Sequence, residues 1–155
     1  MWGGKQLFAF IGGGAAGAVQ SLTTGAPTTI QTWTIPFRCR PIRCGFTLTT
    51  AVTVQSAILR FDVVNRTVAA VAQTTTTGAC GTITMPVSTE GIGKAYYENT
   101  DYVAAGTGAW DATLDEGDQV IARVTQASTA GAGIPWLVVE VDPEQPANNS
   151  SMIAG

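Results

Sequence analysis

Residues 113–143, TLDEGDQVIARVTQASTAGAGIPWLVVEVDP, decide the fold of this chain. Val120, Ala122 and Val124 alternate with wetter positions, which is the period-2 pattern of a strand with one buried face. Residues 134–141 are almost continuously apolar, as in a strand that is covered on both sides. A loop of small residues separates the two runs. The stretch therefore predicts two neighbouring strands that close the core of a β-sandwich.

The composition extends this prediction to the whole chain. The 155 residues are enough for one domain with a real core, and 45% of them are apolar. Threonine and valine favour strands, and glycine and proline interrupt them at intervals. No apolar spacing typical of a helix is sustained. We expect an all-β protein, a single jelly-roll-like β-sandwich of about eight strands spaced roughly ten residues apart.

Three segments are predicted along the chain. Residues 1–43 form an N-terminal arm with one or two strands, residues 44–143 form the β-sandwich domain, and residues 144–155 form a short flexible tail. Pro36 and Pro41 bracket an arginine-rich segment, and proline places such a segment at the edge of a sheet or outside it.

The charges are few and unevenly placed. Only 12% of the residues are charged, against about 25% in an average domain. Residues 1–60 carry five basic and no acidic residues, whereas residues 61–155 carry all 11 acids and three basic residues. Low charge is typical of proteins that pack against other subunits. The asymmetry suits a basic arm that lies on an acidic neighbour, such as the body of another copy.

The chain offers no recognisable catalytic or cofactor chemistry. It contains no histidine, so an imidazole base and a histidine-containing zinc site are both excluded. The glycines of residues 12–17 lack the helix and the acidic residue that dinucleotide binding requires. Cys39, Cys44 and Cys80 are predicted to be buried thiols of a protein made in a reducing cytoplasm. The acidic turn near Asp115 leaves calcium binding open, although a solvated turn explains it as well. We expect no catalytic residue, no cofactor and no metal.

Aromatic and arginine side chains are the candidate binding residues, because they usually carry interface energy. The set expected to bind a capsid or a neighbouring copy is Trp2, Phe8, Phe10, Trp33, Arg38, Arg40 and Arg43. A second set, a possible trimer seam or glycan platform, is Tyr96, Tyr97, Tyr102 and Trp110. An acidic protein with a pI near 4.7 is a poor nucleic-acid binder, and arginine suits carboxylates of a protein partner equally well. Beyond the N-terminal stretch, no run in the sequence approaches the ~20 apolar residues that cross a membrane.

Several segments together resemble the small jelly-roll decoration (cement) proteins, and related fibre or auxiliary proteins, of tailed bacteriophages. The resemblance covers roughly residues 44–143 and is carried by AILRFDVV (57–64), TITMP (82–86), AYYENTDYVAAGTGAWDATLDEGDQVIARVTQA (95–127) and IPWLVVEVDPE (134–144). It implies a virion protein that is made in the host cytoplasm and sits on the outside of an icosahedral head.

The resemblance also implies partners. Such proteins are commonly trimers that clamp neighbouring major capsid subunits, so the expected partners are the major capsid protein and further copies of the chain in a homotrimer. Nucleic acid and membrane are not expected. The alternative function is a carbohydrate-binding β-sandwich on a phage fibre or tail. A third possibility is a structural subunit of another shell or filament.

Overall fold

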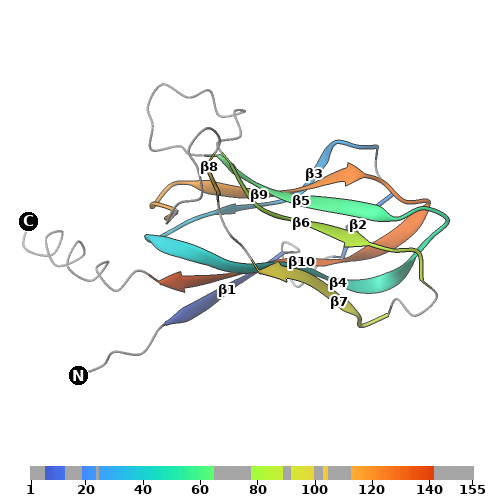
Figure 1. Cartoon of the computed structure of the whole chain (residues 1–155), viewed down its shortest axis with the longest axis horizontal. Helices are drawn as coiled ribbons and strands as arrows, with labels where there is room; N and C mark the ends of the chain where they lie inside the picture. The colour runs from blue at the N-terminus through green and yellow to red at the C-terminus, as the bar shows by residue number, and fades with distance from the viewer. Residues whose placement is uncertain are drawn as a thin grey trace, which may run out of the picture.

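The chain forms two antiparallel sheets that pack face to face (Figure 1). The computed structural model describes residues 6–12, 19–23, 25–64, 78–88, 92–99, 103–104 and 113–141. The strands are β1 (Leu7–Ile11), β2 (Gln20–Ser21), β3 (Thr28–Thr34), β4 (Cys39–Thr53), β5 (Ala57–Val64), β6 (Gly78–Met85), β7 (Ala95–Asn99), β8 (Val103–Ala104), β9 (Gln119–Gln126) and β10 (Ala130–Val141).

The strand order is that of a jelly roll. Sheet A has the order β1-β10-β4-β7, with β2 also paired to β10, and sheet B has the order β3-β9-β5-β6-β8. Strands near the start of the chain therefore pair with strands near its end, β1 with β10 and β3 with β9. Apart from the two-residue strands β2 and β8, each sheet has four strands, and two four-stranded sheets connected in this way form a jelly roll. The prediction of an all-β, jelly-roll-like sandwich is confirmed.

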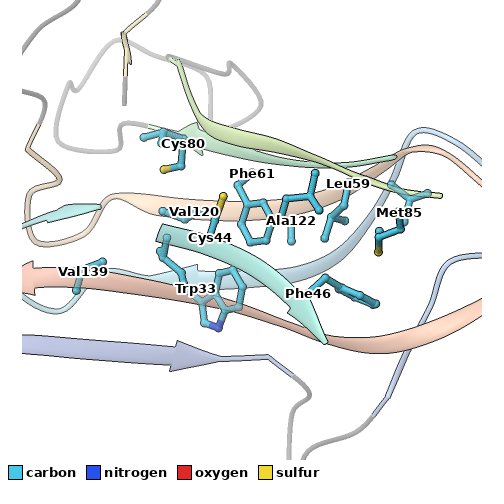
Figure 2. Close-up of a cluster of buried hydrophobic side chains, with 14 of the residues drawn as sticks. Trp33, Cys44, Phe46, Leu59, Phe61, Cys80, Met85, Val120, Ala122 and Val139 are labelled. Atoms are coloured by element: carbon cyan, nitrogen blue, oxygen red, sulfur yellow. The ribbon is translucent and has the colours of Figure 1, made fainter. Parts of the chain in front are cut away.

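The core lies between the two sheets (Figure 2). Val120, Ala122 and Val124 of β9 are fully buried, as their alternation predicts. Trp33 of β3 is 7% exposed and stacks on Phe61 of β5, with ring centroids 6.1 Å apart and planes 7° from parallel. Other fully buried large side chains come from both sheets: Phe46, Leu59, Met85 and Leu137. The apolar faces of the two sheets thus bury each other, which is what holds a sandwich together.

The sandwich begins earlier in the chain than residue 44. β1 and β3 both pair within the sheets, and β4 runs through the middle of sheet A between β10 and β7. Arg38 precedes β4, and residues 39–41 of β4 pair with β10, whereas the register of β4 with β7 begins only at Arg43. Pro41 fits inside β4 because the β10–β4 register shifts between Val138 and Val139, and an irregularity of this kind is a position where a ladder hydrogen bond can be missing. Within the predicted arm of residues 1–43, the described strands β1, β2 and β3 therefore pair in the two sheets of the sandwich.

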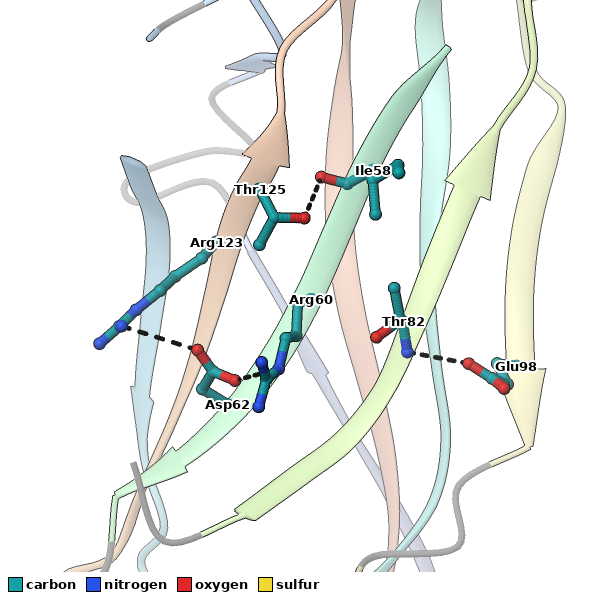
Figure 3. Close-up of polar contacts among 7 residues, drawn as sticks. All are labelled: Ile58, Arg60, Asp62, Thr82, Glu98, Arg123 and Thr125. Atoms are coloured by element: carbon teal, nitrogen blue, oxygen red, sulfur yellow. Dashed lines mark hydrogen bonds and ion pairs between the residues drawn. The ribbon is translucent and has the colours of Figure 1, made fainter. Parts of the chain in front are cut away.

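The outer face of sheet B is polar and carries an ion-pair network (Figure 3). Asp62 is only 4% exposed, and its carboxylate lies 2.7 Å from Arg60 Nε and 3.6 Å from Arg123 Nη1. A nearby threonine, Thr125, donates its hydroxyl to the carbonyl of Ile58 at 3.3 Å. Because Asp62 meets two guanidinium groups, its burial is compensated by charge pairing.

A side-chain contact joins the two sheets near β6 and β7. Glu98 of β7 accepts the backbone N–H of Thr82 of β6 at 2.9 Å (Figure 3). The approach depends on Gly81, where a Cβ would stand 2.9 Å from Cys44 Sγ and 3.1 Å from the Glu98 carboxylate. Glycine therefore allows the edge of sheet A to come close to sheet B at this position.

Candidate interaction surfaces

The predicted partner-binding arginines have contacts inside the chain. Arg38 Nε lies 3.6 Å from Asp115, and Arg40 Nη2 lies 3.7 Å from Glu140. The basic first third of the chain thus meets acidic residues of its own later part, which accounts for these charges without a second copy. Exposed ion pairs of this kind contribute only about 0–1 kcal/mol. The expected pairing of Arg38 and Arg40 with carboxylates of a partner therefore stays a prediction.

Three phenylalanines form an aromatic cluster beside the edge strand β1. Phe8 and Phe10 lie with their ring centroids 4.9 Å apart, and Phe37, from the connection between β3 and β4, lies 5.4 Å from Phe8 and 6.3 Å from Phe10. Phe8 is 45% exposed, while Phe10 and Phe37 are partly buried and pack against the core. This phenylalanine cluster brings together two predicted anchors, Phe8 and Phe10, with Phe37, which was not among the predicted anchors. The cluster is therefore an exposed aromatic surface that is anchored where Phe10 and Phe37 pack against the core.

A second aromatic surface lies on the outer face of sheet A. The strand registers align Ile11, Trp136, Gly45 and Tyr97 in one row across β1, β10, β4 and β7. A side chain on Gly45 would collide with the Trp136 indole, so the indole covers this glycine. The Trp136 and Tyr97 ring centroids are 6.4 Å apart. We call this row and its neighbours on the same face the sheet A platform.

Polar side chains at the sheet A platform are tied to one another. Trp136 Nε1 donates to Thr47 Oγ1 at 3.1 Å. The Arg43 guanidinium lies 4.6 Å from the centre of the Tyr97 ring, and its Nε donates to Asn99 Oδ1 at 3.0 Å. Arg43 thus has a cation–π partner and a hydrogen-bond partner on its own face. Trp136 was missed as a candidate, although its place in a strand with apolar residues at both alternating positions was the available signal.

The remaining candidates lie in different environments. Trp33 is in the core, so the prediction that it anchors a partner is wrong: it points to the inner side of β3, where it meets Phe61. Tyr96 is partly buried against the core, with Lys94 Nζ 5.2 Å from its ring centre. Tyr97 is 57% exposed and belongs to the sheet A platform. Three predicted residues lie outside the described part of the chain: Trp2, Tyr102 and Trp110.

One carboxylate of the acidic turn before β9 accepts a hydrogen bond from the backbone of the same turn. Asp118 is 2% exposed, and its Oδ2 accepts the backbone N–H of Asp115 at 2.9 Å. Gly117 has a φ of 93°, as expected for the glycine of this turn, and donates its N–H to the carbonyl of Ile35 at 2.8 Å. Among the described residues, no group of three or more acidic, cysteine or histidine side chains is placed to hold a metal ion. The turn therefore has a structural role in joining β9 to the end of β3.

The three cysteines are buried free thiols, as predicted. Burial, with the charges of Asp118 and Asp115, raises the pKa of Cys39 from its ordinary 9.0 to about 12. Burial and Glu98 raise the pKa of Cys44 to about 12. Burial also raises the pKa of Cys80 well above its ordinary value. Thiols held in the protonated form are poor nucleophiles and poor metal ligands.

Comparisons with known proteins add one structural likeness. No protein-family model and no curated protein matches the chain. A solved structure described as Eiger TNF from S. frugiperda superposes with a TM-score of 0.49 at 10% sequence identity, over 90% of this chain and 96% of that chain. Within the described residues, no helix is long and apolar enough to cross a membrane.

Proposed function

We propose that this chain is a structural virion protein that decorates a bacteriophage capsid. In this role it is made in the host cytoplasm and bridges neighbouring major capsid subunits from outside the shell as a homotrimer. The observation that carries the proposal is the presence of two exposed aromatic surfaces on one sandwich, the phenylalanine cluster and the sheet A platform. A protein that bridges must contact more than one neighbour, so it needs more than one such surface.

The two surfaces lie on opposite sides of the same edge strand. Phe8 and Phe10 are in register with Val139 and Leu137, which are buried and point inward. Their neighbours along β1 point the other way, because side chains alternate along a strand. The phenylalanine cluster is thus available to the capsid while the sheet A platform is available to other copies. Rings held by strand pairing lose little freedom on binding, which favours affinity.

A single substitution tests the capsid contact. Phe8→Ser is expected to weaken binding to heads assembled from the major capsid protein of the same virus by about 30-fold, since a central aromatic anchor contributes about 2 kcal/mol. The measurement is co-sedimentation of the full-length protein with heads over a range of concentrations. Deleting residues 1–35 is a poorer test, because it removes β1, β2 and β3 from both sheets.

The matched control replaces an exposed apolar residue away from β1. Val87 is 51% exposed and follows β6, so Val87→Ser makes a similar chemical change and should bind heads like the wild type. Equal occupancy of heads by wild type and Phe8→Ser would contradict the capsid role of the phenylalanine cluster.

The alternative function is carbohydrate binding on a phage fibre or tail. It is supported by the Trp136 and Tyr97 rings of the sheet A platform, which stand beside Asn99, because sugars stack on aromatic rings and hydrogen-bond to neighbouring polar groups. A glycan array with the full-length protein separates the two functions. Binding that is lost in Trp136→Ala would favour the carbohydrate module, and absence of binding to any glycan would favour the capsid protein.

A further inference from the structure

The two outer faces of the sandwich differ in chemistry. On sheet B the outward positions carry the Arg60–Asp62–Arg123 network, with Ile121 in register with Asp62 and Thr32. The same face carries exposed threonines: Thr32, Thr34, Thr82, Thr84 and Thr125. On sheet A the outward positions in register with Trp136 and its neighbours are mostly apolar: Leu7, Ala9, Ile11, Ile134, Val138 and Tyr97. Leu7, Ile11 and Tyr97 are 59%, 69% and 57% exposed. A sandwich that faced water on both sides would be polar on both.

The strand β10 gives the same indication from its sequence. Its inward residues Leu137 and Val139 are fully buried against sheet B, whereas its outward residues Ile134, Trp136 and Val138 are only partly buried. A strand that is apolar at both alternating positions is typical of sheets covered on both faces. The chain's own second sheet covers one face of β10. The other face of β10 has the apolar composition of a buried surface.

The indole N–H at the centre of this face already has a hydrogen-bond partner, and Arg43 is held beside the Tyr97 ring. Trp136 Nε1 is bound by Thr47, and Arg43 is held by Asn99 and the Tyr97 ring. Burying an unpaired donor costs about 1–3 kcal/mol, whereas a donor that already has a partner avoids most of that cost. The Trp136 indole, spread over Gly45, also leaves a broad ring instead of a mobile chain at the centre of the face. The aromatic centre of the surface is therefore preorganised for contact.

We infer that copies of this chain associate through the sheet A platform, with Trp136 and Tyr97 at the centre of the contact and Ile11 and Leu7 at its β1 side. The inference rests on the homotrimer of the proposed function and assigns its interface. A neighbouring copy in a three-fold ring fits the platform because Arg40 at its margin is already matched by Glu140 of the same chain, so that copies packed around the axis meet without strong repulsion between these arginines.

The size of the platform is consistent with such a contact. Four strands about 4.8 Å apart, over about six residue steps of roughly 3.4 Å, span about 15 Å by about 20 Å at the level of the backbone. This base is about 300 Å², which is a substantial part of the roughly 800 Å² that each partner buries in a standard protein interface. It can therefore form the centre of a contact with a neighbouring copy.

The test places two charges on each outer face and compares the masses of the proteins in solution. Ile11→Glu with Tyr97→Glu alters the sheet A platform at two exposed positions, and Thr32→Glu with Thr84→Glu is the matched control on sheet B. Light scattering and sedimentation velocity are run on full-length proteins across a dilution series, and circular dichroism verifies folding. The sheet A variant is expected to be monomeric, with association weakened by at least about 100-fold, while the control keeps the mass of the wild type.

The possible outcomes separate the two proposals. An oligomeric wild type with an equally oligomeric, folded sheet A variant would overturn the assigned interface and leave the homotrimer standing. A wild type that is monomeric at every concentration would overturn the inference, and the capsid role would then be decided by head binding alone. If both double variants dissociate equally, the sheet A assignment is also overturned, because the effect does not depend on the face.

Discussion

Phe61→Ala is expected to lower the free energy of unfolding by about 3–5 kcal/mol. Phe61 is fully buried between the sheets and stacks on Trp33. Removing its ring loses the free energy of transferring its apolar area out of water and the van der Waals contacts with its neighbours. A packed core relaxes only partly into the space that is left. Domains of this size are stable by about 5–15 kcal/mol, so the loss is a large share of the total.

Urea denaturation followed by circular dichroism measures this loss. Phe8→Ala is the matched control, because it removes the same ring from a position that is 45% exposed. Its cost should be about 1 kcal/mol, the scale of an exposed aromatic contact. A loss of less than about 1 kcal/mol for Phe61→Ala would contradict the packing of the core described above.

Alkaline pH is expected to destabilise the protein steeply. The pKa of Cys39 and of Cys44 is about 12 in the folded chain, against an ordinary value of 9.0. Above about pH 9 the unfolded chain therefore releases thiol protons that the folded chain retains. Folding stability falls with rising pH wherever the folded state binds more protons. Each of the two thiols removes about 1.4 kcal/mol per pH unit in this range.

Urea denaturation at pH 7, 9, 10 and 10.5, for the wild type and a Cys39→Ala, Cys44→Ala variant, provides the check. Substitution lowers stability at neutral pH because it shortens two buried side chains, so the quantity compared is the slope of stability against pH. The variant should lose stability less steeply above pH 9 than the wild type. Parallel slopes for the two proteins would contradict the assignment of the effect to these thiols.

The closing strands of the sandwich were predictable because their signals are local. The alternation of Val120, Ala122 and Val124 selects one buried face of β9, and the long apolar run selects β10. The fold class followed from the same kind of pattern repeated along the chain. The buried state of the cysteines was also predictable, since uncharged thiols favour the interior.

The course of β4 was not predictable in the same way. Pro41 and the neighbouring arginines are local signals against a strand, yet residues 39–43 extend β4 because they pair with β10, almost a hundred residues later in the chain. The side of β3 that carries Trp33 shows the same limit. Alternation placed Trp33 and Ile35 on one face, and both are buried, but alternation alone does not say which face meets the other sheet.

The sheet A platform depends on register between distant strands. Ile11, Trp136, Gly45 and Tyr97 come from four strands, and only their pairing brings them into one row. The apolar run of β10 nevertheless indicated part of this face from the sequence. The run predicted to be covered on both sides is covered by the chain on one side, and the other side is the face proposed to meet further copies.

Electron cryomicroscopy of heads mixed with the purified protein tests the central proposal most directly. We expect added density on the outside of the shell at three-fold and quasi-three-fold positions, with three sandwiches around each axis, sheet A facing the axis and the phenylalanine cluster facing the major capsid protein. Heads that show no added density at saturating protein would contradict the capsid role. Density for single sandwiches away from these axes would contradict the trimer.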